Sequence, residues 1–159
     1  MTDARVEIVD VYVLRFAPAA AGRGPEVLAL RRAPGLRSPG TWETVHGHVN
    51  AGEAPVVAAL RELKEETGLV PERFYNLSRV ETFYLHRRDL VALIPAFCAM
   101  VPAGAGVALS EEHDRSEWLH ADEASRRFTW PREKRALADA IALFVSGDGG
   151  GAEDVLRIL

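Results

Sequence analysis

The chain has one cysteine, Cys98, among its 159 residues, so it cannot form an internal disulfide. Because Cys98 stands in the apolar run LIPAFCAM, we expect a buried and unreactive thiol. Long hydrophobic runs are also lacking, and none approaches the roughly 20 residues that a membrane span needs. Positive charge is not in excess either: the net charge is −4, which argues against nucleic acid as the main partner.

The N-terminus lacks the apolar stretch of a secretory signal, because charged residues stand at positions 3, 5, 7 and 10. We therefore expect a cytoplasmic protein. The length suits one domain with a proper core. We assign this domain to residues 1–146, and residues 147–159 to a flexible tail or, alternatively, a docking helix.

Runs rich in β-branched and aromatic residues, bounded by Pro and Gly, predict an α/β protein with a mixed sheet. A loop is expected over residues 17–25 and another over residues 102–116. Helices are expected near 55–67, over 121–128 and over 131–146. The expected strands cover residues 5–16, 26–32, 41–47, 74–89, 90–102 and 117–120.

The first helix carries clear signals at both ends. Pro55 is tolerated in a first helical turn, and Gly68 stands where a left-handed C-terminal cap belongs. The spacing of Val56, Leu60, Leu63 and Thr67 predicts the buried stripe.

Three carboxylates crowd one side of this helix. Glu62, Glu65 and Glu66 are three or four residues apart, so they are neighbours on the helix surface. Arg61 can pair with Glu65, but excess negative charge remains. A hard divalent cation such as Mg²⁺ would offset the repulsion, because it takes oxygen ligands and shares them with substrate phosphates.

Residues 47–69 match the signature G-x5-E-x7-R-E-U-x-E-E-x-G-U, in which U is aliphatic, and the chain resembles the Nudix (MutT-like) hydrolases. The nine specified positions are filled by Gly47, Glu53, Arg61, Glu62, Leu63, Glu65, Glu66, Gly68 and Leu69. The resemblance implies an α/β/α sandwich with a central mixed sheet, in which this Nudix box forms a loop, a helix and a loop. The position before the first glycine holds His46, where many relatives have a second glycine.

The resemblance also implies the chemistry: hydrolysis of a nucleoside diphosphate linked to another group, with Mg²⁺ or Mn²⁺ and an attacking water. Carried onto this chain, Glu62, Glu65 and Glu66 would bind the metal, with the Gly47 carbonyl as a further ligand. Arg61 would orient the glutamates. Among the other signature residues, Glu53 would brace the box and Gly68 would end its helix.

A general base must lie within hydrogen-bond reach of the attacking water. Glu66 is one candidate. Glu112 is another, because similar enzymes supply a base from the corresponding loop, and the adjacent Glu111 is a third. These alternatives stay open at the level of sequence.

For the substrate, we expect a nucleoside triphosphate or a related nucleoside diphosphate derivative, because Trp42 and the spacing from Glu112-His113 to Trp118-Leu119 are similar to the bacterial dATP and dihydroneopterin triphosphate pyrophosphatases. Tyr84 points instead to relatives that cleave dinucleoside polyphosphates, and nucleotide sugars are a further alternative. A Nudix-fold module that senses a nucleotide without cleaving it is the hypothesis of another class.

Five residues are candidates for contact with a small nucleotide substrate. Guanidinium groups match phosphate oxygens, and an indole can stack on a base. Each candidate also has an ordinary structural interpretation as a strand end, a basic turn or a packed aromatic. The five are Arg31, Arg32, His86, Arg87 and Trp42. The five histidines show no ligand spacing, so we expect them on surfaces or loops. A homodimer is possible for a protein of this kind.

Overall fold

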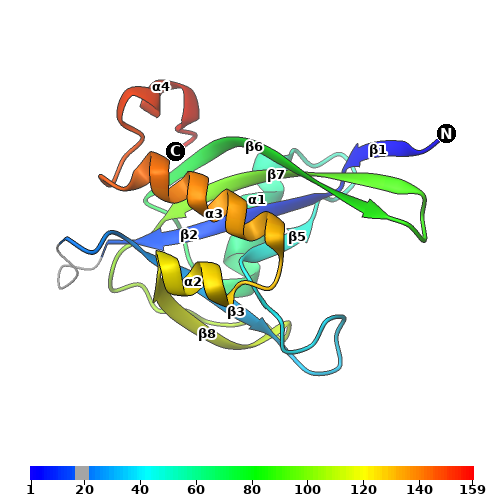
Figure 1. Ribbon diagram of the computed structural model, residues 1–159, viewed down its shortest axis with the longest axis horizontal. Coiled ribbons are helices and arrows are strands. Elements are labelled where there is room, and N and C mark those ends of the chain that lie inside the picture. The colour runs from blue at the N-terminus through cyan, green and yellow to red at the C-terminus, as the bar shows by residue number, and fades with distance from the viewer. Residues whose placement is uncertain (17–21) are drawn as a thin grey trace.

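The computed structural model describes residues 1–16 and 22–159 (Figure 1). The loop predicted over residues 17–25 lies partly outside the described residues, which include only its positions 22–25.

Within the described residues, eight strands form one mixed sheet. The long strand β7 pairs in parallel with β1 and β2, and the other pairings are antiparallel. The strands are β1 (Asp3–Val6), β2 (Ile8–Arg15), β3 (Glu26–Arg32), β4 (Trp42–Glu43), β5 (Val45–His48), β6 (Arg73–Leu85), β7 (Leu90–Met100) and β8 (His113–His120).

Several predicted strands have wrong limits. The strand predicted over residues 41–47 is two strands, β4 and β5, which pair with β3 and β2 respectively. The strand predicted over residues 5–16 is two strands, β1 and β2. From Val6 to Asp10 the chain advances four residues while its partner β7 advances three, from Leu93 to Ala96, so one extra residue interrupts the ladder. The strand predicted over residues 117–120 begins at His113, because β8 pairs with the whole length of β3.

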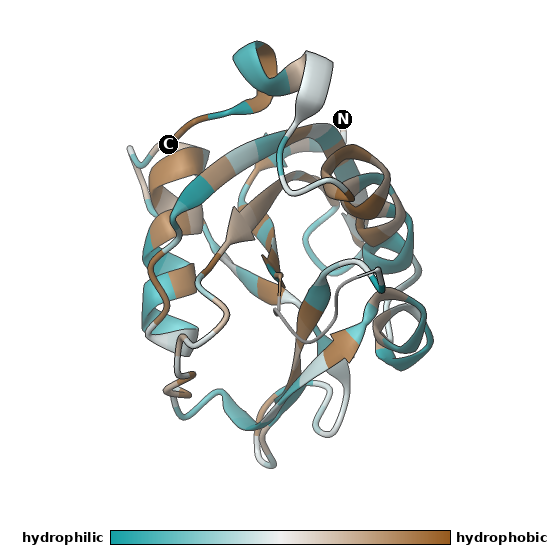
Figure 2. Cartoon of the chain, turned by 90° about the vertical axis from the view of Figure 1, so that its left-hand side faces the viewer, coloured by the Kyte–Doolittle hydropathy of each residue, from teal (hydrophilic) through white to brown (hydrophobic). Residues whose placement is uncertain are grey.

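Helices cover both faces of the sheet (Figures 1 and 2). On one face α1 (Pro55–Thr67) packs on β2 and β5, while α2 (Ala121–Arg127) and α3 (Pro131–Phe144) lie on the other. Successive side chains of β2 point to opposite faces of the sheet, so the strand packs against both helical layers: Val11 faces α1 and Tyr12 faces α3. The α/β/α sandwich with a central mixed sheet is therefore confirmed. Among the described residues, no helix is long and apolar enough to cross a membrane.

The box helix α1 begins at Pro55 and ends at Gly68, whose φ of 70° is the left-handed cap. The buried stripe differs from the prediction, because Val56 and Leu60 are only half-buried. The residues inside are Ala58, Ala59, Leu63, Glu66 and Thr67. One of the three box glutamates is therefore part of the helix face that packs on the sheet.

The last residues pack against the domain. After Gly147 a 3-10 turn (Gly150–Ala152) and the short helix α4 (Glu153–Leu156) return the chain to β6. There the Ile158 N–H donates to the Phe74 carbonyl over 2.7 Å, and Arg157 forms a β-bridge with Tyr75. Of the two forms expected for residues 147–159, the structure has the docked one, because the edge of β6 offers unpaired backbone groups and the core accepts Leu156.

Leu156 and Val155 are adjacent but differ in exposure, at 5 % and 82 %. We expect Leu156→Ala to lower the free energy of unfolding by about 2 kcal/mol, because a buried aliphatic side chain leaves the core. Val155→Ala should change it by less than about 0.5 kcal/mol. Urea denaturation compares the two variants, and equal effects would mean that the tail is detached in solution.

Candidate active site

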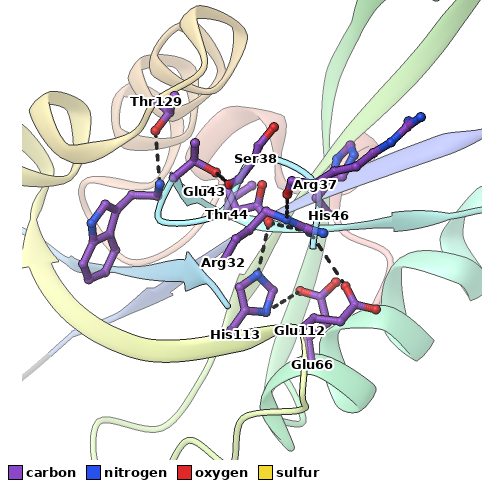
Figure 3. Close-up of polar contacts among 12 residues, drawn as sticks. Arg32, Arg37, Ser38, Glu43, Thr44, His46, Glu66, Glu112, His113 and Thr129 are labelled. Atoms are coloured by element: carbon purple, nitrogen blue, oxygen red, sulfur yellow. Dashed lines mark hydrogen bonds and ion pairs between the residues drawn. The ribbon is translucent and has the colours of Figure 1, made fainter. Parts of the chain in front are cut away.

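Glu66 is a carboxylate enclosed by protein. It lies in the last turn of α1, with 2 % of its surface exposed (Figure 3). Neither carboxylate oxygen accepts a hydrogen bond of normal geometry within the described residues. The His46 backbone N–H, which is close by, lowers the pKa of Glu66, but less than the other influences raise it. Burial raises the pKa of Glu66 to about 9, helped by negative charge on Glu112, Glu62 and Glu43. A pKa near 9 means that the folded protein favours the protonated, neutral form of Glu66 at neutral pH.

His113 and Glu43 form the wall beside Glu66. The His113 ring lies with Nε2 3.1 Å from a Glu43 oxygen and Nδ1 3.8 Å from Glu66 (Figure 3). Arg32 donates to the same Glu43 oxygen over 3.1 Å. Although burial alone would raise the pKa of Glu43, the contacts with His113 and Arg32 hold it below its usual value.

Arg61 ties the remaining box carboxylates together. Its guanidinium donates to both oxygens of Glu53 over 2.9 Å, and to Glu62 and Glu65 over 2.8 and 3.1 Å. It also donates to the His48 carbonyl. These bonds hold the pKa of Glu53 at about 2. Arg61 therefore compensates Glu62 and Glu65 in this structure, whereas Glu66 has no cationic partner of comparable strength.

Gly47 makes room for Glu62. It is buried in β5, and a Cβ atom at this position would lie 2.0 Å from the Glu62 Cδ. Any larger residue would displace that carboxylate. The glycine at this position of the signature thus has a steric reason, which does not depend on a second glycine at His46.

The carboxylates fit a hard divalent cation in charge and chemistry. Among the described residues, no three His, Cys, Asp or Glu side chains are already arranged as a ligand set, because Arg61 holds Glu62 and Glu65. However, the partnerless buried oxygens of Glu66, with further carboxylates around them, have the hard donors and the unbalanced negative charge that Mg²⁺ or Mn²⁺ would compensate.

Of the five candidates for substrate contact, the structure brings Arg32 to the carboxylates. Arg32 lies 3.9 Å from Glu112 as well as against Glu43. Arg31, the preceding residue of the strand, points to the other face and pairs with both oxygens of Asp114. Its guanidinium is therefore already engaged by a carboxylate.

Trp42 also lies on the other face, toward α2. Its indole is half-buried, with the guanidinium carbons of Arg127 and Arg115 4.6 and 5.9 Å from the ring centroid. Ligand stacking there would compete with these cation–π contacts.

The turn between β6 and β7, which holds His86 and Arg87, is exposed. The residues beside these two make contacts within the turn and with the N-terminal segment. Arg88 pairs with Glu7, and the exposed Tyr84 donates its hydroxyl to Asp89 over 2.8 Å. None of these contacts joins the turn to the cluster around Glu66.

Sequence reasoning missed Glu43 and His113. The prediction that His113 is a surface or loop residue is wrong, because it is 4 % exposed and starts β8. Strand alternation was an available signal for Glu43, since Glu43, Val45 and Gly47 share the face toward α1. No local signal distinguishes His113 from the other four histidines.

The raised pKa of Glu66 predicts a pH-dependent stability without metal. Between pH 4.5 and about 9 the folded protein keeps a proton that the unfolded chain loses, so the free energy of unfolding falls as pH rises. The Glu66→Gln variant has no ionisable group at this position, so its free energy of unfolding does not fall with pH for this reason. In EDTA, we expect the melting temperature of the variant, relative to wild type, to increase from pH 5 to pH 8.5. A difference that does not change with pH would contradict the assignment.

Known proteins resemble this chain over most of its length. The pattern of the NUDIX domain family matches residues 8–140. A Myxococcus xanthus protein named octanoyltransferase is 36 % identical over 130 residues, or 76 % of this chain. The chain spans only 34 % of that protein's length.

Two further similarities cover more than three quarters of the other protein. The asymmetrical bis(5'-nucleosyl)-tetraphosphatase of Rattus norvegicus is 30 % identical over 116 residues, which are 72 % of this chain and 77 % of the relative. A C. elegans Ap4A hydrolase, solved as a binary complex, superposes with a TM-score of 0.72 and 25 % identity, over 90 % of this chain and 99 % of that one. The chain therefore belongs to the Nudix family of hydrolases, which act on pyrophosphate bonds of nucleotides.

Proposed function

We propose that this chain hydrolyses a pyrophosphate bond of a nucleotide with the help of bound Mg²⁺ or Mn²⁺. The observation that carries this proposal is the buried Glu66 carboxylate, whose oxygens accept no hydrogen bond from the residues that the structure describes and which is surrounded by negative charge. Nudix hydrolases generally use divalent metal ions. When bound, such an ion neutralises phosphate oxygens and acidifies a water molecule.

In this proposal the metal ligands are Glu62, Glu65 and Glu66, with the Gly47 carbonyl. Glu66 would serve as a ligand in its deprotonated form, and Glu62 and Glu65, which Arg61 holds in this structure, would supply the other carboxylate oxygens. Glu53 keeps both of its bonds to Arg61, so the guanidinium stays beside the metal site. Arg61 is then a positioning residue that orients the box glutamates.

We propose Glu112 as the general base. It lies near enough to Glu66 to be the neighbour that raises its pKa most strongly, yet 53 % of its side chain is exposed and open to water. Glu66 is enclosed and serves better as a ligand. Arg32, which lies between Glu43 and Glu112, is in position to meet a phosphate at the same place.

For the substrate, we propose a dinucleoside polyphosphate. The support is the likeness to proteins named bis(5'-nucleosyl)-tetraphosphatase and Ap4A hydrolase. The second candidate is a nucleoside triphosphate that yields a monophosphate and pyrophosphate. It rests on the sequence around Trp42 and on the Glu112-His113 and Trp118-Leu119 spacing.

Two adjacent glutamates test the general base. We expect Glu112→Gln to lower kcat by about 10²–10⁴-fold, the usual effect of losing a positioned acid–base group. Glu111→Gln is the matched control, because Glu111 is exposed and directly precedes Glu112. Steady-state kinetics at saturating Mg²⁺ compare them, and equal losses in the two variants would place the base elsewhere.

Product identification tests the function itself. Incubated with Mg²⁺ and a panel of nucleotides, the pure protein should convert a dinucleoside tetraphosphate to a mono- and a triphosphate faster than it converts nucleoside triphosphates. Release of pyrophosphate from a triphosphate at a higher kcat/KM would support the second candidate. Tight binding without any product, with Mg²⁺ or Mn²⁺, would reject hydrolysis and favour a sensing module.

A further inference from the structure

The first turn of α3 contacts residues 44–47, which lead into and include most of strand β5 (here called the box strand, because it carries Gly47), from the side opposite α1. Residues 44–47 alternate, so Val45 and Gly47 face α1 while Thr44 and His46 face α3. Arg132 and Glu133, in the first turn of α3, each contact one of these α3-facing residues. The strand that carries Gly47 is thus held on both faces.

Arg132 joins two side chains from β2 and β5. Its Nε donates to one oxygen of Asp10 over 3.0 Å, and its Nη2 lies 3.3 Å from the other and 3.2 Å from the His46 Nδ1. The same Nδ1 is 2.6 Å from Asp10. Asp10 is fully buried and Arg132 is 9 % exposed, so solvent does little to weaken these contacts.

Glu133 holds the neighbouring backbone. Its Oε1 accepts the Thr44 N–H over 3.1 Å, and the Thr44 hydroxyl donates to the Val11 carbonyl over 2.5 Å. Glu133 is fully buried, and its second oxygen has no hydrogen-bond partner within the described residues. Two carboxylates and one guanidinium are therefore enclosed at this point.

Such a buried charged cluster is a poor source of stability, because desolvation offsets much of the attraction, and apolar residues of similar volume often serve as well. Its distinctive property is direction, because charge-assisted hydrogen bonds are geometrically specific, and here they involve the His46 ring and the Thr44 N–H. The same stretch of backbone contacts the box carboxylates. Gly47 contacts Glu62 on its other face, and the His46 N–H acts on Glu66.

We propose that Arg132, with Asp10 and Glu133, is a positioning residue that sets the backbone of residues 44–47 for metal binding by the box. The proposal rests on the function proposed above. It assigns to α3 a role in metal affinity and turnover, although α3 lies across the sheet from the box carboxylates.

Three variants on one helix test this role. Arg132→Met removes the guanidinium group that contacts Asp10 and His46. Arg132→Lys keeps the positive charge, but a single ammonium group cannot span both residues. Arg135→Met is the control. Arg135 stands one turn further along α3 and pairs with Glu81, away from β5. We expect Arg132→Met to lower kcat and raise the Mg²⁺ concentration for half-maximal turnover by about 10–100-fold, the range for residues behind metal ligands. Arg132→Lys should fall between it and wild type.

The nucleotide KM is expected to stay unchanged in all three variants, because Arg132 acts through the strand. A folded Arg132→Met protein with unchanged kcat and Mg²⁺ dependence would overturn the proposal. A change confined to KM would also overturn it, since Arg132 would then contact the substrate. Thermal melting monitors folding, and Arg132→Lys carries the test if the Met variant does not fold.

Mn²⁺ binding measured by electron paramagnetic resonance, without substrate, separates this proposal from the function. If the wild type binds Mn²⁺ but hydrolyses nothing, the proposed function fails, while weaker Mn²⁺ binding by the Arg132 variants still supports positioning. If the wild type is active and the variants bind Mn²⁺ equally well, only the positioning role fails.

Discussion

The site depends on a carboxylic acid that helix geometry forces into the interior. The turn of α1 that packs Leu63 and Thr67 against the sheet also encloses Glu66, next to Glu43 and His113. The nearby guanidinium of Arg61 does not neutralise it, because Arg61 is engaged by Glu53, Glu62 and Glu65. The folded protein therefore keeps a buried acid at a place where, on the proposed function, a small cation with oxygen ligands would remove the cost of burial.

The strand below this acid has two faces with different functions. Toward α1, Gly47 leaves space for Glu62. Toward α3, His46 is bonded into the Asp10–Arg132 cluster. Because the side-chain period of a strand is two, a shift of one residue would exchange these faces and move both the glycine and the histidine out of place. On the proposed function, the register of β5 on β2 would therefore constrain the site as well as the fold.

The box, the layered fold and most elements could be predicted from the sequence, because their signals are local. The spacing of the glutamates, Pro55 and Gly68 needs no knowledge of the rest of the chain. The environment of Glu66 could not be predicted in this way. His113 and Arg132 are separated from their partners by 70 and 122 residues and meet them only through the pairing of β3 with β8 and the packing of α3. The docking of the tail on β6 is likewise a long-range contact.

Proton release on metal binding tests the central claim most directly. Isothermal titration of the protein with MgCl₂ at pH 7, in buffers that differ in ionisation enthalpy, counts the protons that leave as the ion binds. Because Glu66 must lose its proton to become a ligand, the account predicts about one proton released per ion in the wild type. Mg²⁺ binding without proton release, or no binding at all, would contradict it.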